Sequence, residues 1–139
     1  MLRSSDDKAL RPRVAPIVIG GALAVVAFDG VGSFAAKQLG FSYALLIPGS
    51  LLIYGTVAAL VARRREWLVG VFAALAMAMT DLTAGWAVSW AIGPGRAPGG
   101  LTAITVAGAV MTAFVLGGLA GAIGAWIGTR ANKTSGPGY

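Results

Sequence analysis

The sequence predicts an all-α polytopic membrane protein, a four-transmembrane-helix bundle built from one domain of 139 residues. Hydrophobic residues make up 57% of the chain and charged residues 12%, whereas soluble domains carry about a quarter of charged residues. The apolar residues form four separate runs, and each can cross the roughly 30 Å hydrocarbon core of a bilayer as a helix. The runs lack the two-residue alternation of a membrane barrel, so helices are expected throughout the membrane.

The four expected spans follow one another with short connections. They cover residues 14–36, 43–62, 67–92 and 101–128, between polar tails at 1–13 and 131–139. In the second span, Pro48 and Gly49 predict a kink or a local unwinding near one end. Between the third and fourth spans, the segment 93–100 is rich in Gly and Pro and predicts an irregular loop.

The basic residues predict the orientation of the bundle. Nine of the eleven Lys and Arg residues fall in the two tails, directly before the C-terminal tail (Arg130), or in the turn between the second and third spans. The other two, Lys37 and Arg96, fall on the opposite side. Because basic residues favour the cytoplasmic side, we expect a multi-pass protein of the cell membrane with both its N- and C-termini in the cytoplasm. The two expected interfaces also carry aromatic residues, namely Trp67, Trp126, Tyr43 and Trp90.

The two halves of the chain resemble each other when one is shifted by 52 residues. The Arg-x-Arg pair at 11 and 13 then meets the pair at 63 and 65, and Asp29 meets Asp81. Each Asp follows the preceding Arg by 16 residues, which is about 24 Å of helix at 1.5 Å per residue, so both carboxylates are expected at similar depth. We interpret the match as two parallel two-helix repeats. Shared membrane-helix composition is the alternative explanation.

Asp29 and Asp81 are the strongest candidates for a functional site. A carboxylate in the middle of a span costs about 3 kcal/mol on membrane-insertion scales, and such residues usually face the bundle interior or a wet cavity. Nearby hydroxyl groups could donate hydrogen bonds to them, and a tryptophan could contact a cation. The candidate proton, cation or ligand site therefore comprises Asp29, Ser33, Thr80, Asp81, Thr83 and Trp86. The alternative is structural, with each Asp protonated and bonded to a neighbouring helix.

Small side chains at helical spacing predict which faces point inward, because they let another helix approach. Around Asp29 these neighbours are Gly21, Val25, Gly32, Ser33 and Ala36. Around Asp81 they are Ala74, Met77, Ala78, Ala84 and Gly85.

The fourth span carries a glycine face that predicts close helix packing, inside the bundle or between protomers. Its expected packing positions are Gly117, Gly121, Gly124 and Gly128, with Gly55 and Ala59 of the second span as the matching pair. Thr102, Thr105 and Thr112 add a polar line that could face the carboxylates.

The absence of cysteine and histidine from the sequence excludes several functions. Disulfide chemistry and histidine proton relays are impossible, and zinc and haem sites lose their usual ligands. The sequence contains no phosphate-binding loop, metal cluster or catalytic triad, so we expect no cofactor and no metal. Basic residues interleaved with aromatic residues are also missing, so nucleic acid is not an expected partner. The expected partners are membrane lipids, together with further copies of the chain or other membrane subunits.

Three functions stay open on these observations. The first is transport or permeation through the paired carboxylates. The second is a non-catalytic subunit or assembly factor of a larger membrane complex, as the glycine face and short loops suggest. The third is an intramembrane enzyme that acts on a lipid or isoprenoid through two aspartates.

The size and four-helix plan resemble those of small multidrug exporters, which bind protons and cations at a membrane carboxylate. Those exporters use a glutamate of their first helix and function as dimers of inverted or mixed orientation. Here none of the four spans contains Glu, and the charge bias fixes one orientation. The resemblance is therefore limited to the overall plan.

Overall fold

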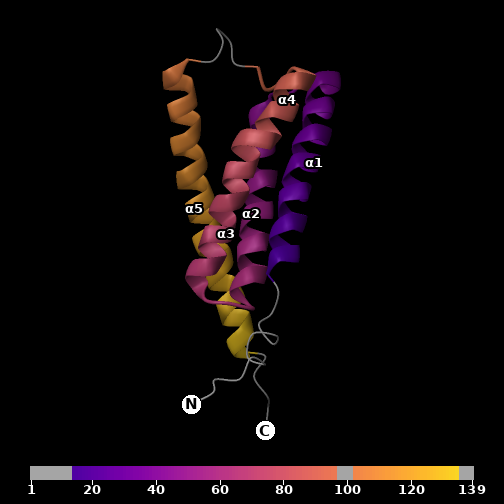
Figure 1. Ribbon diagram of the computed structural model, residues 1–139. Coiled ribbons are helices and arrows are strands. Elements are labelled where there is room, and N and C mark those ends of the chain that lie inside the picture. Colours follow the sequence, from indigo (N-terminus) through magenta and orange to yellow (C-terminus); the bar gives the residue numbers. More distant parts are fainter. Residues whose placement is uncertain (1–13, 97–101, 135–139) are drawn as a thin grey trace, which may run out of the picture.

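The computed structural model describes residues 14–96 and 102–134 (Figure 1). The elements in chain order are α1 (Ala15–Leu39), the 3₁₀ turn η2 (Tyr43–Leu46), α2 (Ile47–Ala62), α3 (Trp67–Thr80), the π-helical turn η3 (Asp81–Gly85), α4 (Trp86–Ile92) and α5 (Ala103–Thr134). Within these residues, four helical stretches are long and apolar enough to cross a membrane: Ala15–Leu39, Tyr43–Ala62, Trp67–Ile92 and Ala103–Ala131. The predicted all-α fold with four membrane-spanning helices is confirmed.

The first and last helices are longer than the sequence predicts. α1 continues past residue 36 to Leu39 and ends where Gly40 takes a left-handed conformation with φ of 71°, its N–H bonded to the carbonyl of Ala36. α5 begins at Ala103 and continues to Thr134, into the expected C-terminal tail. Hydropathy marks the apolar part of a helix, but the helix itself ends only where its backbone groups find other partners.

The irregularity expected around Pro48 lies before α2 rather than within it. The 3₁₀ turn η2 begins after Ser42, whose hydroxyl accepts a hydrogen bond from the N–H of Ala44 at 3.3 Å. Pro48 then lies in the first turn of α2, where its missing N–H leaves no hydrogen bond unmade. The third expected span also contains an irregularity, the π-helical turn η3. The sequence pattern does not predict it.

α2 is the central helix and packs against α1, α3 and α5 (Figure 1). We call the end of the bundle with the Arg63–Arg65 turn the basic end and the opposite end the far end. Towards the far end, α5 leans away from the other helices (Figure 1), and its residues 103–108 are exposed. The buried core includes Val25, Tyr54, Val57, Val61, Ala74, Met77 and Ala125.

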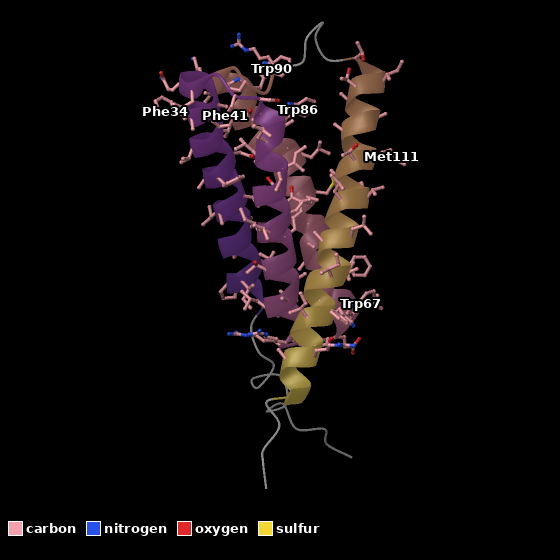
Figure 2. All side chains as sticks on the ribbon, turned by 180° about the vertical axis from the view of Figure 1, so that it is seen from behind. Phe34, Phe41, Trp67, Trp86, Trp90 and Met111 are labelled. Atoms are coloured by element: carbon pink, nitrogen blue, oxygen red, sulfur yellow. The ribbon has the colours of Figure 1, made fainter. Side chains whose placement is uncertain are left out.

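The outside of the bundle is covered by apolar side chains (Figure 2). Leu23, Val31 and Leu52 are 67%, 72% and 73% exposed, as suits a surface that meets acyl chains instead of water. Trp67 lies near the basic end and Trp90 near the far end (Figure 2), the usual places of tryptophan at the two membrane interfaces.

The glycine face of α5 lies inside the bundle, against α2 and α3. A Cβ added at Gly124 would meet the backbone of Gly55, and one at Gly128 would meet the backbone of Ala59. On the other side of the same face, a Cβ added at Gly117 or Gly121 would lie 2.7 Å from the Cβ of Ala78 or Ala74, respectively. The basic-end half of α5 is thus fixed by direct backbone contact, which larger side chains would prevent.

Replacing Gly124 by alanine is expected to lower the free energy of unfolding by about 2 kcal/mol, because the added methyl group would overlap backbone atoms that cannot turn aside. Gly108 of the same helix is the matched control, since nothing lies within 4 Å of a Cβ there. Gly108→Ala should be neutral or stabilise by up to about 1 kcal/mol through helix propensity. Thermal unfolding in detergent measures both variants. Equal effects of the two changes would contradict the packing role of Gly124.

Candidate functional site

The third membrane span changes from an α-helix to a π-helical turn at Asp81. η3 begins with Asp81 and ends with Gly85, between α3 and α4. The hydroxyl of Thr80 donates to the carbonyl of Ala76 at 2.9 Å, and that of Thr83 donates to the carbonyl of Met79 at 2.7 Å. Such bonds compete locally with the helical backbone pattern, and π-helical turns occur frequently at functional sites.

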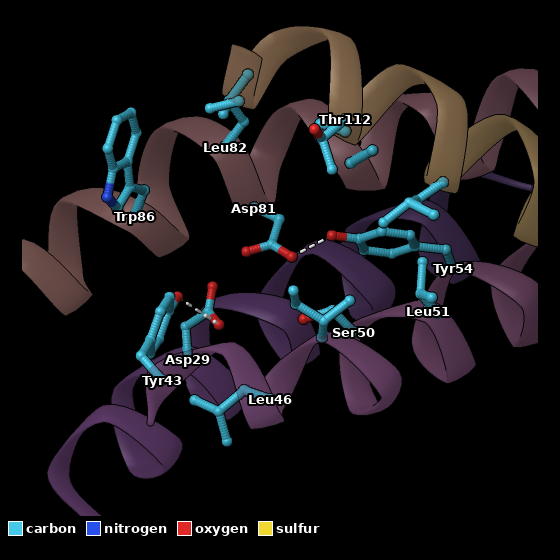
Figure 3. Close-up of a pocket in the computed structure, with 15 residues that line it drawn as sticks. Asp29, Tyr43, Leu46, Ser50, Leu51, Tyr54, Asp81, Leu82, Trp86 and Thr112 are labelled. Carbon is cyan, nitrogen blue, oxygen red and sulfur yellow. Dashed lines mark hydrogen bonds between the residues drawn. The ribbon is translucent and has the colours of Figure 1, made fainter. Parts of the chain in front are cut away.

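The carboxyl groups of Asp29 and Asp81 face each other across Gly85 (Figure 3). A Cβ added at Gly85 would meet both Oδ2 of Asp29 and Oδ1 of Asp81. Only a glycine therefore allows the two carboxyl groups to approach at this point. Because both carboxyl groups lie beside Gly85, they are at a similar depth in the bundle, as the sequence predicts.

Each carboxyl group also accepts a hydrogen bond from a tyrosine (Figure 3). The hydroxyl of Tyr43 donates to Oδ1 of Asp29 at 3.2 Å, and the hydroxyl of Tyr54 donates to Oδ2 of Asp81. One oxygen of each carboxyl group is thus held by a tyrosine, and the other is directed at the opposite carboxyl group. Asp29 is only 1% exposed, whereas Asp81 is half-buried.

The carboxyl pair lies on the wall of a cavity of about 300 Å³. Its polar groups come from the two aspartates, the two tyrosines, Ser50, Trp86 and Thr112, and the rest of the wall is apolar. α5 closes one side with Ala109, Thr112, Ala113 and Leu116 (Figure 3). No Lys or Arg is found among the described residues that line this cavity, so the pair has no basic neighbour there.

The six predicted site residues do not all lie together. Asp29, Asp81 and Trp86 line the cavity. Ser33 is buried but lies outside the cavity lining. Thr80 and Thr83 also lie outside it, and their hydroxyls bond to their own helix.

The side chain of Trp86 is fixed by a hydrogen bond to the loop after α4 and by a ring contact with Trp90. Its Nε1–H donates to the carbonyl of Gly95 at 2.9 Å, and its ring meets that of Trp90 edge-to-face at 6.5 Å between centroids. Of the polar line expected along the fourth span, Thr112 lines the cavity, whereas Thr102 and Thr105 are exposed at the far end.

Sequence reasoning missed Tyr43, Ser50, Tyr54 and Gly85 as site residues. A signal for three of them was present, because Ser50 and Tyr54 are four residues apart and Tyr43 precedes Tyr54 by eleven. At 3.6 residues per turn these positions fall near one face of the second span. That polar stripe on an apolar helix could have been paired with the two aspartates.

The chain matches no family model, no curated protein and no solved structure. The function is therefore argued from the chemistry of the site itself.

Proposed function

We propose that this membrane protein exchanges cations for protons across the bilayer, with Asp29 and Asp81 as the binding site that both ions share. The observation that carries the proposal is the close approach of the two carboxyl groups at Gly85, on the wall of an otherwise largely apolar cavity. Intramembrane carboxylates of this kind mark ion pathways and proton relays.

Electrostatics makes the pair suited to exchange. Two carboxylates at about 4 Å repel each other by about 4 kcal/mol at an effective dielectric constant of about 20. One bound proton or one bound cation removes that repulsion. Binding of a second ion is then far less favourable, because there is no longer a repulsion to relieve. Because either ion satisfies the pair alone, binding of one releases the other.

The cavity favours an organic cation of modest size. Its aromatic residues Tyr43, Tyr54 and Trp86 stand beside the carboxyl pair, and aromatic faces attract quaternary ammonium groups. A cavity of about 300 Å³ lies at the lower end of the range for small-molecule sites. An ammonium ion with one aromatic ring fits both conditions.

Proteoliposomes that hold a pH-sensitive dye test the proposal. An inward gradient of benzyltrimethylammonium should raise the internal pH, because each cation that enters displaces a proton outward. Neopentylbenzene, its uncharged isostere, should leave the pH unchanged. The double variant Asp29→Asn/Asp81→Asn should reduce the response to the level of empty liposomes. No response from the native protein, or an equal response from the double variant, would contradict the proposal.

A second candidate function is that of a subunit in a larger membrane complex. The observation that favours it is the far-end part of α5, whose residues 103–108 are exposed in the chain described. In that case the purified chain alone moves no cation, and a tagged copy retains other membrane chains after mild solubilisation.

A further inference from the structure

Three buried polar atoms remain without a hydrogen-bond partner within residues 14–96 and 102–134. They are Oδ2 of Asp29, Oγ of Ser33 and Oγ of Ser89. Both serines are 0% exposed. Buried polar atoms in native proteins are normally bonded to the protein or to ordered water, and an unbonded one destabilises the fold. Oδ2 of Asp29 is directed at Asp81 and can bond to it through a shared proton, so the two serine hydroxyls are the atoms that point to a ligand with hydrogen-bonding capacity.

The three atoms follow the seam between α1 and α4. Both helices run from the basic end towards the far end (Figure 1), and they are in contact. Gly85 packs against Asp29, and a Cβ at Gly30 would lie 3.5 Å from Val88. One helical turn beyond Asp29 and Gly85, the same register brings Ser33 opposite Ser89.

This seam borders the cavity at Asp29 and at Tyr43, whose hydroxyl lies beside Ser89. Neither Ser33 nor Ser89 belongs to the cavity lining, whereas Asp29 belongs to both. Asp29 therefore joins two environments, with a largely apolar cavity towards α2 and α5 and a row of hydroxyl groups towards the far end.

The loop after α4 covers the far end of the seam. The N–H of Gly95 donates to the carbonyl of Ser89 at 3.3 Å, and the carbonyl of Gly95 accepts from Nε1–H of Trp86 at 2.9 Å. A Cβ added at Gly95 would meet Oγ of Ser89. The row of polar atoms thus extends from the carboxyl pair to the loop, with about 6 Å of helix rise between Asp29 and Ser33.

We infer that the seam holds a chain of buried water molecules, bound by Ser33 and Ser89, which conducts protons between the far end and Asp29. A serine hydroxyl both donates and accepts hydrogen bonds. It can therefore bind water and relay a proton from one water molecule to the next. Protons then reach the carboxyl pair through the seam, and the organic cation reaches it through the cavity. The direction of exchange rests on the proposed function, but the hydration of the seam does not.

Infrared spectroscopy tests the inference without any cation. The protein in lipid nanodiscs is moved from H₂O to D₂O, and the carbonyl band of the protonated aspartate pair, assigned with Asp29→Asn and Asp81→Asn, is followed as it shifts. Ser33→Ala/Ser89→Ala should slow this shift by about tenfold or more, because the seam loses its water-binding groups. Thr56→Ala removes an exposed hydroxyl that donates to the carbonyl of Leu52 in its own helix, away from the carboxyl pair, and should change the rate less than about twofold. Ser89→Thr keeps a hydroxyl and should retain the native rate.

Unchanged exchange in the double serine variant, or equal slowing by Thr56→Ala, would overturn the inference. A band that disappears on addition of sodium chloride but not choline chloride would also overturn it, because the three oxygens would then hold a cation. A native protein without a protonated-carboxyl band would do the same. The single serine variants give the same test if the double variant does not fold. Serine-dependent exchange in a protein that moves no cation would leave the inference standing and remove only the proposed function.

Discussion

Gly85→Ala is expected to destabilise the protein by about 3 kcal/mol and to abolish cation exchange. The added Cβ would overlap one oxygen of Asp29 and approach one of Asp81, and overpacking of this kind costs about 1–3 kcal/mol. A carboxylate at a surface could swing away, but Asp29 is 1% exposed and is bonded to Tyr43. The carboxyl groups must therefore separate, which destroys the site that both ions share.

Two companion variants isolate the cause of this effect. Gly30→Ala lies in the same seam, where the added Cβ meets Val88 at an ordinary distance of 3.5 Å, and should cost less than about 1 kcal/mol. Asp29→Ala removes the overlapping oxygen, so the double variant Gly85→Ala/Asp29→Ala should be more stable than the sum of the two single effects predicts. Denaturation in detergent measures all of these proteins. Additive effects of the two single changes would show that the methyl group added at position 85 strains something other than the carboxyl pair.

The buried face of the first span can be predicted from its sequence alone. The five neighbours predicted to face inward with Asp29 are all buried, from Gly21 to Ala36. Small and polar residues recur there at helical spacing, and this spacing directly fixes a face. Around Asp81 the prediction is less complete, because Ala84 is exposed. The π-helical turn that begins at Asp81 changes the angular spacing of the residues after it.

The tyrosine partners were not predictable in the same way. Tyr43 reaches Asp29 from the 3₁₀ turn ahead of α2, and Tyr54 reaches Asp81 from inside α2, about two turns after its start. Which tyrosine meets which aspartate depends on how the helices cross, and hydropathy carries no information on that. The internal duplication stays a prediction, since the facing aspartates agree with it without requiring it.

The two aspartates should differ in what they contribute to binding. Asp81 is half-buried beside the cavity, whereas Asp29 is 1% exposed and also borders the serine seam. The cation should therefore contact mainly Asp81, and Asp29 should mainly hold the exchanged proton. The titratable groups that face this pair are Tyr43 from η2 and Tyr54 from α2, and both should remain neutral donors.

This division predicts opposite results for the two isosteric replacements. Asp81→Asn should weaken binding of benzyltrimethylammonium at least about 30-fold, because a charge contact worth about 2–4 kcal/mol is lost. Asp29→Asn should keep the affinity near neutral pH within about threefold and should remove most of its pH dependence. In the native protein the proton competes with the cation, so affinity should rise as the pH rises. Without Asp29, the remaining carboxylate has no like charge beside it and no second site for a shared proton.

Calorimetric titration between about pH 6 and about pH 8, within the range where proteins are usually most stable, measures both variants. Asn retains an oxygen that can accept the tyrosine hydrogen bond, so both proteins should stay within about 1 kcal/mol of native stability. If the aspartates served only to fix helix register, the replacements would lower stability and leave cation affinity unchanged. Equal loss of affinity in both variants would instead show that the cation contacts the two carboxyl groups alike. That result would contradict separate roles for Asp81 in cation contact and Asp29 in proton binding.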